Sequence, residues 1–295
     1  MTEQRFKRVV SFGSALVDIM AFLPALPPRG GDVLATDALE SIGAVLNIET
    51  ASARMGLPTV HAGSIGDGPH SQELLKLFAN EGIEFGGHTF AGKDLGFCFT
   101  MVEPDGERTF VTHSGAEAYW SSEHLANLKL RPTDAVYLAG YDMVYPTSRQ
   151  VLTEWLLSDP LNGAALFFDP GPLVAHLAPE VVEYLRREAF CITANEREFE
   201  VMPSLATDRA LFVRRLGAGG SEFWECGQLR AKAPCTPVTP VDSTGAGDVH
   251  SGTLIAMLAA GKSWAAALEI ANSAAAYCVQ RRGGTQGPTL AQLGL

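Results

Sequence analysis

The chain has 295 residues, and its 33 acidic and 22 basic side chains give a formal net charge of −11. This acidity argues against a surface for nucleic acid or an anionic membrane, since either partner needs a basic face. With 46% hydrophobic and 19% charged residues, the composition excludes wholesale disorder and suits one large α/β domain.

The cysteines and the longest apolar runs indicate the cellular location of the protein. The five cysteines are scattered and form no C-x-x-C pair, which predicts free thiols in a reducing compartment. No apolar run reaches the ~18–20 residues of a membrane span. We therefore expect a cytoplasmic protein without a membrane segment.

Short apolar runs alternate along the chain with segments of helical periodicity. The runs predict strands at residues 8–12, 60–63, 135–139, 164–169, 190–193 and 210–216. The periodic segments predict helices at residues 45–55, 71–81, 147–157, 179–188, 247–260 and 264–280. Strands that are apolar throughout and alternate with helices indicate an α/β fold with a parallel sheet covered on both faces.

Two extended segments interrupt this alternation. Residues 97–102 and 108–112 flank a Pro-Asp-Gly turn, which predicts a β-hairpin. A second extended stretch, 32–41, follows a Pro/Gly-rich segment. Together they could build a small β-sheet outside the main domain, either as a lid over a site or as a hairpin without a role in function.

Residues 241–248, Val-Asp-Ser-Thr-Gly-Ala-Gly-Asp, precede and open a predicted helix. Gly245, Ala246 and Gly247 thus lie where free N–H groups and the helix dipole favour an anion. Asp248 would repel a phosphate, but it suits a general base that takes a proton from a hydroxyl attacking the phosphate. The alternative is an ordinary helix start with an Asp in its first turn.

Other polar residues also follow predicted strands. Asn195 and Glu198 have the spacing of a capping box, or they order water around Mg²⁺ and phosphates. Asp18 is either a turn residue or an acceptor for the hydroxyls of a polyol. Asn47, on its own, would be a helix cap. Because ligands of open α/β sheets bind at the carboxyl ends of the strands, this grouping points to one site at that edge.

Several motifs together resemble the ribokinase-like (PfkB-type) carbohydrate kinase family over essentially the whole chain. Residues 242–248 resemble its D-[ST]-T-G-A-G-D motif. Further motifs agree in order and spacing: Gly13-Ser14 with Asp18, Gly63-x-x-Gly66-Asp67, Asp105-Gly106-Glu107-Arg108-Thr109, Asn195-x-x-Glu198 and Leu216-Gly217. The resemblance implies that the γ-phosphoryl group of ATP is transferred to a hydroxymethyl group of a sugar or nucleoside.

The resemblance also implies a single α/β domain over residues 1–295, with a Rossmann-like, doubly wound and mainly parallel sheet. A small β-sheet lid would be formed by two excursions, at about residues 14–42 and 92–116. Lids of this family often cover each other in a dimer, so we expect a homodimer that meets through the lid.

Residue roles follow from the resemblance by position. It implies Asp248 as the catalytic base and Gly245, Ala246 and Gly247 as the anion hole. It implies substrate contacts for Asp18, Gly43 and Asn47. The implied nucleotide site comprises Asn195, Glu198, Arg215, Gly217, Gly220 and Asn272, with Glu198 acting on Mg²⁺ through water. A K⁺ site is implied at Asp242 and Thr244, with carbonyls near Val279, Arg282 and Gly284.

Three residues depart from the family pattern and affect the expected substrate. Ile42 replaces a glycine of the substrate motif and adds bulk there. Ala44 stands where kinases of phosphosugars often carry Lys, which argues against an anionic sugar phosphate. His250 stands where an apolar residue is usual. We therefore expect an ATP-dependent kinase of a small neutral sugar, a pentose or a hexose.

Two alternatives remain at this stage. One is a nucleoside kinase of the same family, in which aromatic side chains would stack on a base: Phe97, Phe99, Tyr119 and Trp120. The other is a non-catalytic, sugar-binding regulator on a kinase scaffold, which the altered motif around Ile42 motivates.

Overall fold

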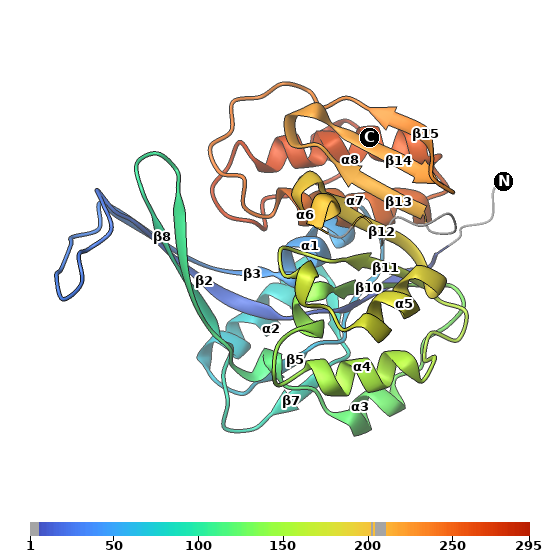
Figure 1. Cartoon of the computed structure of the whole chain (residues 1–295), viewed down its shortest axis with the longest axis horizontal. Helices are drawn as coiled ribbons and strands as arrows, with labels where there is room; N and C mark the ends of the chain where they lie inside the picture. Colours follow the sequence, from blue (N-terminus) through green and yellow to red (C-terminus); the bar gives the residue numbers. More distant parts are fainter. Residues whose placement is uncertain (1–5, 202, 204–210) are drawn as a thin grey trace.

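The computed structural model describes residues 6–201, 203 and 211–295. A large sheet crosses the molecule in the order β15-β14-β13-β12-β11-β10-β1-β4-β6 (Figure 1). In chain order its strands are β1 (Arg8–Phe12), β4 (Thr59–His61), β6 (Ile83–Phe85), β10 (Asp134–Ala139), β11 (Ala165–Asp169), β12 (Ala189–Asn195), β13 (Leu211–Arg215), β14 (Ser221–Glu225) and β15 (Gln228–Ala233). All neighbouring strands are parallel from β6 to β13, and β14 and β15 extend that edge as an antiparallel hairpin.

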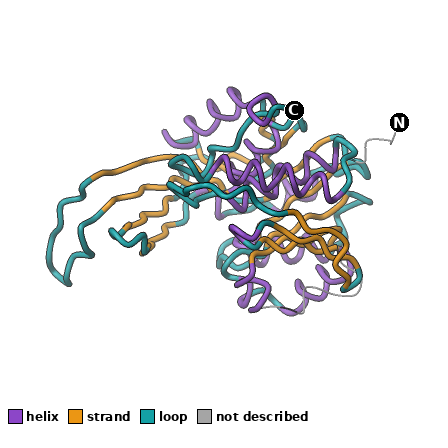
Figure 2. Tube along the Cα trace, turned by 90° about the horizontal axis from the view of Figure 1, so that it is seen from above, coloured by secondary structure: helices purple, strands orange, loops and turns teal. Residues whose placement is uncertain are grey.

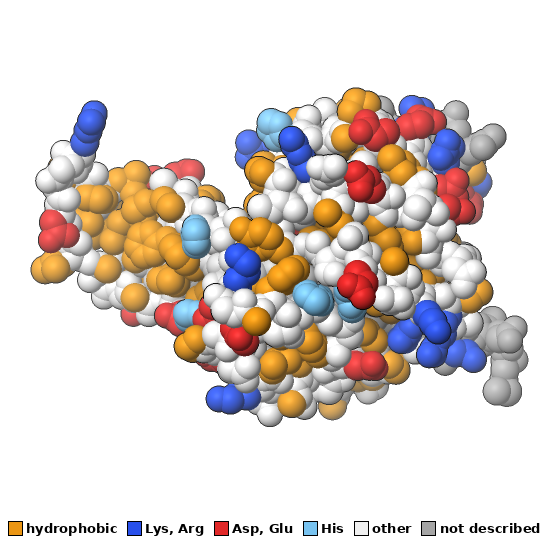
Figure 3. Space-filling model, turned by 90° about the horizontal axis from the view of Figure 1, so that it is seen from below, with side chains coloured by type: hydrophobic (Ala, Val, Ile, Leu, Met, Phe, Trp, Pro, Cys, Tyr) orange, Lys and Arg blue, Asp and Glu red, His pale blue; other side chains and the backbone are white. Residues whose placement is uncertain are grey.

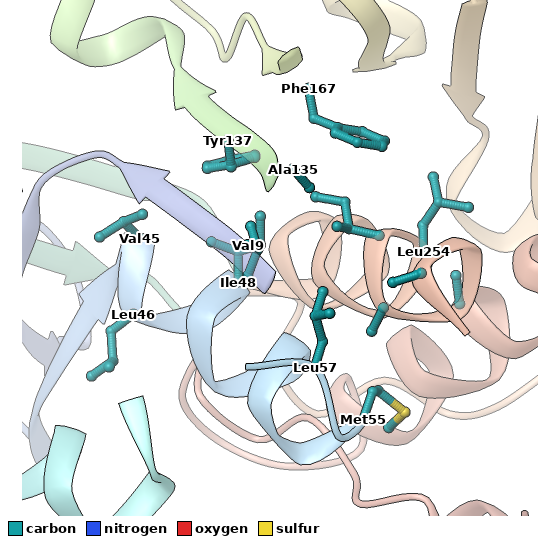
Figure 4. Packing of buried hydrophobic residues seen from close by; sticks show 14 of the residues in the cluster. Val9, Val45, Leu46, Ile48, Met55, Leu57, Ala135, Tyr137, Phe167 and Leu254 are labelled. Carbon is teal, nitrogen blue, oxygen red and sulfur yellow. The ribbon is translucent and has the colours of Figure 1, made fainter. Parts of the chain in front are cut away.

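Helices cover both faces of the large sheet, because the strands are buried on both sides. One face carries α1 (Val45–Arg54), α2 (Pro69–Glu81), α7 (Ala246–Ala259) and α8 (Trp264–Cys278). The other face carries α3 (Ser122–Asn127), α4 (Arg149–Leu157) and α5 (Pro179–Glu188). Figure 4 shows the first of these cores, where α1 and α7 meet side chains of β1, β10 and β11.

A second, four-stranded sheet, which we call the small sheet, projects from the main body (Figures 1 and 2). Its order is β3-β2-β8-β9. The strands are β2 (Ala15–Phe22), β3 (Asp37–Ala44), β8 (Phe97–Val102) and β9 (Arg108–His113). Two further short strands, β5 (Ser64–Gly66) and β7 (His88–Phe90), pair with each other.

Buried carboxylates hold the small sheet where the chain enters and leaves it. Ser14, just before β2, donates from its hydroxyl to Asp142 Oδ1 at 2.5 Å and from its backbone N–H to Oδ2 at 3.3 Å. Glu117 accepts from the N–H groups of Gly96 and Gly115, which flank β8 and β9, at 2.7 and 2.8 Å. These bonds fasten both excursions to the main body.

Most sequence predictions for the large sheet are confirmed. The strands and helices predicted there have bounds within two residues of those observed, and β1 and α5 match at both ends. Residue 210 of one predicted strand lies outside the described residues. The described part of the chain has no helix with the length and apolar character needed to cross a bilayer.

The predicted placement of Asp18 in a loop after the first parallel strand is wrong. Gly13 and Ser14 end β1, and the β-prone run that follows forms β2, with Asp18 near its middle. Sequence reasoning also missed β14 and β15, and the second extended stretch begins at Asp37 rather than at residue 32. The short helix α6 (Glu196–Val201) starts where the capping-box interpretation of Asn195 and Glu198 puts a helix.

Candidate active site

The N-terminus of α7 forms an anion-binding corner at the carboxyl ends of the parallel strands. Gly245 is its cap and has φ +72°, a conformation that favours glycine. A Cβ on Gly245 would lie 2.5 Å from Gly284 Cα, so the packing also requires glycine. The N–H groups of Gly247 and Asp248, in the first turn of the helix, have no preceding turn to bond to, whereas that of Ala246 donates to the carbonyl of Ser243 at 3.3 Å.

Asp248 lies in the first turn of α7 and is partly buried. Asn47 Nδ2 donates to Asp248 Oδ2 at 2.9 Å. Burial raises the pKa of Asp248 to about 7; the Asn47 hydrogen bond opposes this rise and the charge of Asp169 adds to it. A carboxylate with a pKa near neutrality is poised to exchange a proton.

Three predicted substrate residues converge on the same point from the small sheet and α1. A Cβ on Gly43 would collide with the Asp18 carboxylate and lie 3.7 Å from Asn47 Oδ1. Asn47 is 3% exposed, and its Oδ1 has no hydrogen-bond partner. Burial and the charge of Asp242 raise the pKa of Asp18 to about 6. These carboxylate and amide groups form a polar recess beside Asp248 that is matched to a ligand with hydroxyl groups.

Asn195 and Glu198 form a reciprocal capping box at the start of α6. Asn195 N–H donates to Glu198 Oε2 at 2.8 Å, and Glu198 N–H donates to Asn195 Oδ1 at 2.9 Å. Asn195 Nδ2 also donates to Glu198 Oε1 at 2.8 Å. Glu198 is 7% exposed, and burial together with the charge of Asp169 raises its pKa. The box thus holds the Glu198 carboxylate in a fixed position.

Arg215 connects this carboxylate to the helix N-terminus. Its guanidinium contacts Asp169 Oδ2 at 2.6 Å, Glu198 Oε2 at 3.3 Å and the carbonyl of Gly247 at 3.3 Å. The two carboxylates raise the pKa of Arg215 against the effect of burial, so its charge is permanent. Arg215, predicted as a nucleotide residue, is thus beside the anion-binding corner.

Asp169 is a site residue that sequence reasoning missed. It ends β11 and is 7% exposed, with its carboxylate bound by Arg215 and by Thr193 Oγ1 at 3.2 Å. The sequence feature that could have identified Asp169 is its position at the end of an apolar strand, directly before Pro170.

The remaining residues predicted for the nucleotide site lie in the β13–β14 turn or hold the β14–β15 hairpin in place. Gly217 and Gly220 have φ +55° and +87° in that turn, and the backbone of β15 blocks a Cβ on Gly220. Asn272 donates to the carbonyls of Ala233 and Pro234 at 2.9 and 3.3 Å and accepts from Ser221 Oγ at 3.0 Å. Its amide N–H groups are therefore used to fasten α8 to the β14–β15 hairpin.

His250 is 3% exposed on α7, and burial with the charge of Arg215 lowers its pKa to about 3. The imidazole is therefore neutral. Ile42 packs in the main core together with Val17, its neighbour on β2, so its bulk points away from the recess that Asp18 and Gly43 form.

Of the residues implied for K⁺, Asp242, Thr244 and Val279 are already bonded. Asp242 Oδ1 accepts from Thr244 N–H at 2.9 Å, Thr244 Oγ1 at 2.7 Å and Arg108 Nη2 at 3.1 Å, and Oδ2 accepts from Gly283 N–H at 3.0 Å. The carbonyl of Val279 accepts from the N–H groups of residues 241 and 242 at 2.7 and 3.1 Å. Two members of the implied K⁺ donor set, the Asp242 carboxylate and the Val279 carbonyl, are thus occupied by donors of the protein itself.

Arg282 and Gly284 complete the implied set. The Arg282 side chain pairs with Asp37 of the small sheet at 2.7 Å, and the Gly284 backbone lies against Gly245 and Asn47. Arg108 was part of a motif in the sequence but had no predicted role.

Comparisons with known proteins show the family of the chain. The family model described as pfkB family carbohydrate kinase matches residues 7–290. The chain is 31% identical to the Escherichia coli protein described as uncharacterized sugar kinase YegV, over 97% of this chain and 92% of that protein. It is 27% identical to rice fructokinase-1, over 85% of this chain and 83% of that protein.

Solved structures show the same fold. The ribokinase of Thermotoga maritima has a TM-score of 0.79 at 20% identity and covers 98% of both chains. A nucleoside kinase of Methanocaldococcus jannaschii has a TM-score of 0.82 at 16% identity, over 98% of this chain and 97% of that one. The chain thus has the ribokinase fold. The chain belongs to the pfkB family of carbohydrate kinases.

Proposed function

We propose that the protein transfers the γ-phosphoryl group of ATP to a hydroxymethyl group of a small neutral sugar, a pentose or a hexose, with Asp248 as general base. The observation that carries the proposal is the meeting of two features at one point. A carboxylate of raised pKa stands at a helix N-terminus suited to phosphate, and it faces a recess of hydroxyl-binding groups.

The sugar would occupy the recess between the small sheet and α1. The Asp18 carboxylate and the unpartnered Asn47 Oδ1 offer acceptors to its hydroxyl groups. The Asn47 amide also orients Asp248 through their 2.9 Å hydrogen bond. One hydroxyl would thereby be held beside the base, and this positioning lowers the entropic barrier to attack.

The phosphoryl group would bind at the start of α7. The N–H groups of Gly247 and Asp248 and the helix dipole would stabilise the negative charge on its oxygens, and Arg215 adds a fixed positive charge at the same corner. Asp248 accepts the proton of the sugar hydroxyl as that oxygen attacks phosphorus. The small sheet acts as a lid that excludes water and so limits ATP hydrolysis.

Mg²⁺ would be held near Arg215 through water, because the carboxylates there already accept hydrogen bonds from the protein. Glu198 and Asp169 are buried carboxylates within reach of one guanidinium, and their mutual repulsion helps to raise the pKa of Glu198. Mg²⁺ prefers such oxygen donors and commonly keeps water in its shell, so Glu198 would hold it through water. Bound there with ATP, the ion would neutralise phosphate charge.

A sugar is favoured over a nucleoside by the positions of the aromatic side chains. Trp120 is 6% exposed and stacks on Phe12, while Tyr119 lies 6.0 Å from Phe90. By strand alternation, Phe97 and Phe99 lie on the face of the small sheet opposite Asp18. None of the four aromatic residues predicted for stacking is thus shown beside the recess.

A purely regulatory role is disfavoured because the groups for catalysis are present together. Asp248, the glycine-capped helix and Arg215 would serve no purpose in sugar binding alone. The burial of Ile42 in the core also removes the motive for that alternative.

The test measures ADP release from Mg·ATP with pentoses, hexoses, sugar acids and nucleosides. We expect a signal specific to one or a few neutral sugars, which Asp248→Asn abolishes. ADP release with nucleosides alone would show that the substrate is a nucleoside rather than a sugar. ATP binding without ADP release for any acceptor would favour the regulator.

A homodimer through the small sheet and a cytoplasmic location complete the proposal. Figure 3 shows hydrophobic side chains gathered on one face of the small sheet. In this sheet Phe97, Phe110 and Val111 are 37%, 58% and 54% exposed, with Phe110 and Val111 on opposite faces. Apolar faces and open edges of this kind are usually covered. Light scattering of the purified protein, compared with Phe110→Asp and Val111→Asp, tests the dimer.

A further inference from the structure

Arg108 of the small sheet binds the loop that leads into the anion-binding corner. Its Nη1 donates to Thr244 Oγ1 at 3.0 Å, and its Nη2 pairs with Asp242 Oδ1 at 3.1 Å. Arg108 opens β9, more than 130 residues from either partner. The contact exists only because the small sheet lies against this loop.

The Asp242 carboxylate is 7% exposed and carries a full set of donors. The N–H groups of Gly283 and Thr244 and the guanidinium of Arg108 all donate to this carboxylate. A buried carboxylate kept ionised needs a cation close by. In this protein Arg108 provides that charge.

A metal cation would compete with Arg108 for the same oxygens. It would have to displace the guanidinium from Asp242 Oδ1 and Thr244 Oγ1, or else lie beside a like charge. The Val279 carbonyl, which would complete its shell, already accepts two N–H groups. Arg108 and these N–H groups therefore occupy Asp242 and the Val279 carbonyl without a metal ion.

A second contact shows that the small sheet engages this region as a unit. Asp37, Phe22, Val102 and Arg108 form one row across the four strands. At the other end of the row, Arg282 pairs with Asp37 at 2.7 Å and lies 5.0 Å from the centre of the Phe22 ring. The row thus contacts the loop that leads into α7 and the loop that follows α8.

We propose that Arg108 takes the place of the monovalent cation in this chain, so that the cation for the anion-hole loop is delivered by the small sheet itself. K⁺ is then not required. When the small sheet moves away, Asp242 loses its counter-charge and the loop before α7 loses a support. Docking of the small sheet over the sugar therefore assembles the anion hole. This inference rests on the kinase function proposed above.

The experiment follows thermal stability and ADP release as KCl replaces tetramethylammonium chloride at constant ionic strength. For the wild type we expect no K⁺-selective change in either. For Arg108→Ala we expect turnover about tenfold lower without K⁺, with a saturable, K⁺-selective gain in both turnover and melting temperature. Arg108→Lys keeps the charge and is expected to stay insensitive to K⁺.

Asp37→Asn is the matched control. It breaks the neighbouring contact of the same row but leaves Asp242 paired, so it is expected to show no response to K⁺. A saturable K⁺ response of the wild type would overturn the proposal, as would an active, folded Arg108→Ala that ignores K⁺. If turnover falls in Arg108→Ala only for acidic sugars, the guanidinium binds substrate instead, and the proposal also fails.

The melting temperatures separate this proposal from the kinase assignment. They need no acceptor sugar, so a K⁺ response can be read even if the substrate panel is silent. If Arg108→Ala does not fold, the wild-type titration alone still decides the matter, because a K⁺-selective rise in its melting temperature contradicts a site filled by Arg108.

Discussion

The phosphoryl side and the sugar side of the site are built in different ways. On the phosphoryl side, Asp169, Glu198 and Arg215 each stand at or just after the end of a strand of one parallel sheet, and the backbone of α7 binds the charge. On the sugar side, Asp18 and Gly43 come from the small sheet and Asn47 from α1. The phosphoryl side depends on local motifs at the ends of strands of the large sheet. The sugar side depends on how the small sheet packs against the main body.

This difference has a consequence for variation among related kinases. Changes in the strands of the small sheet can alter the sugar recess while the α7 corner remains intact. Substitutions on the phosphoryl side should therefore reduce turnover for every acceptor, and those on the sugar side should change acceptor affinity. Four predictions test this contrast.

The largest effect is expected for Asp248→Asn. The amide keeps the size of the side chain but cannot accept the proton, so turnover should fall by about 10²–10⁴-fold. ADP affinity, measured by calorimetry, should stay within about threefold because the N–H groups remain. Turnover close to that of the wild type would disprove the base assignment.

Gly245→Ala should reduce turnover by about 10–100-fold with any acceptor, because the anion-hole backbone must shift. The new Cβ would lie 2.5 Å from Gly284 at a φ of +72°. Gly82→Ala is the control, since its φ is +69° but nothing lies within 4 Å. Gly82→Ala should cost about 1 kcal/mol of stability and leave turnover unchanged. Equal turnover in both variants would argue against the anion hole.

Gly43→Ala should raise KM for the sugar by about tenfold while the affinity for ADP is unchanged. The added methyl group would displace the Asp18 carboxylate. Gly106→Ala, in the hairpin turn of the small sheet with open space around it, controls for general loosening of that sheet. A fall in ADP affinity in Gly43→Ala would show that the two sides are not separable.

The smallest effect on activity is expected at Asp142, which anchors the small sheet. Burial raises the pKa of Asp142 from 3.8 to about 7. Between these values the folded protein holds a proton that the unfolded chain releases, so this group makes the free energy of unfolding fall as pH rises from about 4 to 7, by at most about 4 kcal/mol. Asp142→Asn keeps the neutral shape and removes this decline.

Denaturant unfolding of the wild type and Asp142→Asn at pH 5 and pH 8 shows whether the free energy of unfolding falls with rising pH as expected. Asp142→Asn should gain stability relative to the wild type as pH rises. Parallel pH dependence in the two proteins would mean that Asp142 is ionised in the folded state throughout, against the raised pKa.

Much of the large sheet could be predicted because its signals are local. Continuous apolar runs define the parallel strands, and helical periodicity defines α1, α5 and α8. The β14–β15 hairpin was missed because polar residues interrupt both strands, Ser-Glu-Phe-Trp-Glu and Gln-Leu-Arg-Ala-Lys-Ala, and because β15 is a largely exposed edge strand. Asp18 was misplaced because a lone carboxylate in an apolar run is typical of a turn, and only pairing with β3 and β8 makes it part of a strand.

The sequence by itself determined the parallel sheet, the glycine-capped helix with Asp248 in its first turn, and the family to which the chain belongs. These depend on residue types at short spacing, where backbone geometry leaves few choices. Only the tertiary structure decided that Asp169 joins Arg215, that Ile42 faces the core, and that Arg108 pairs with Asp242. Such contacts join segments far apart in the chain, and their free energy depends on burial and charge that exist only after the small sheet has docked.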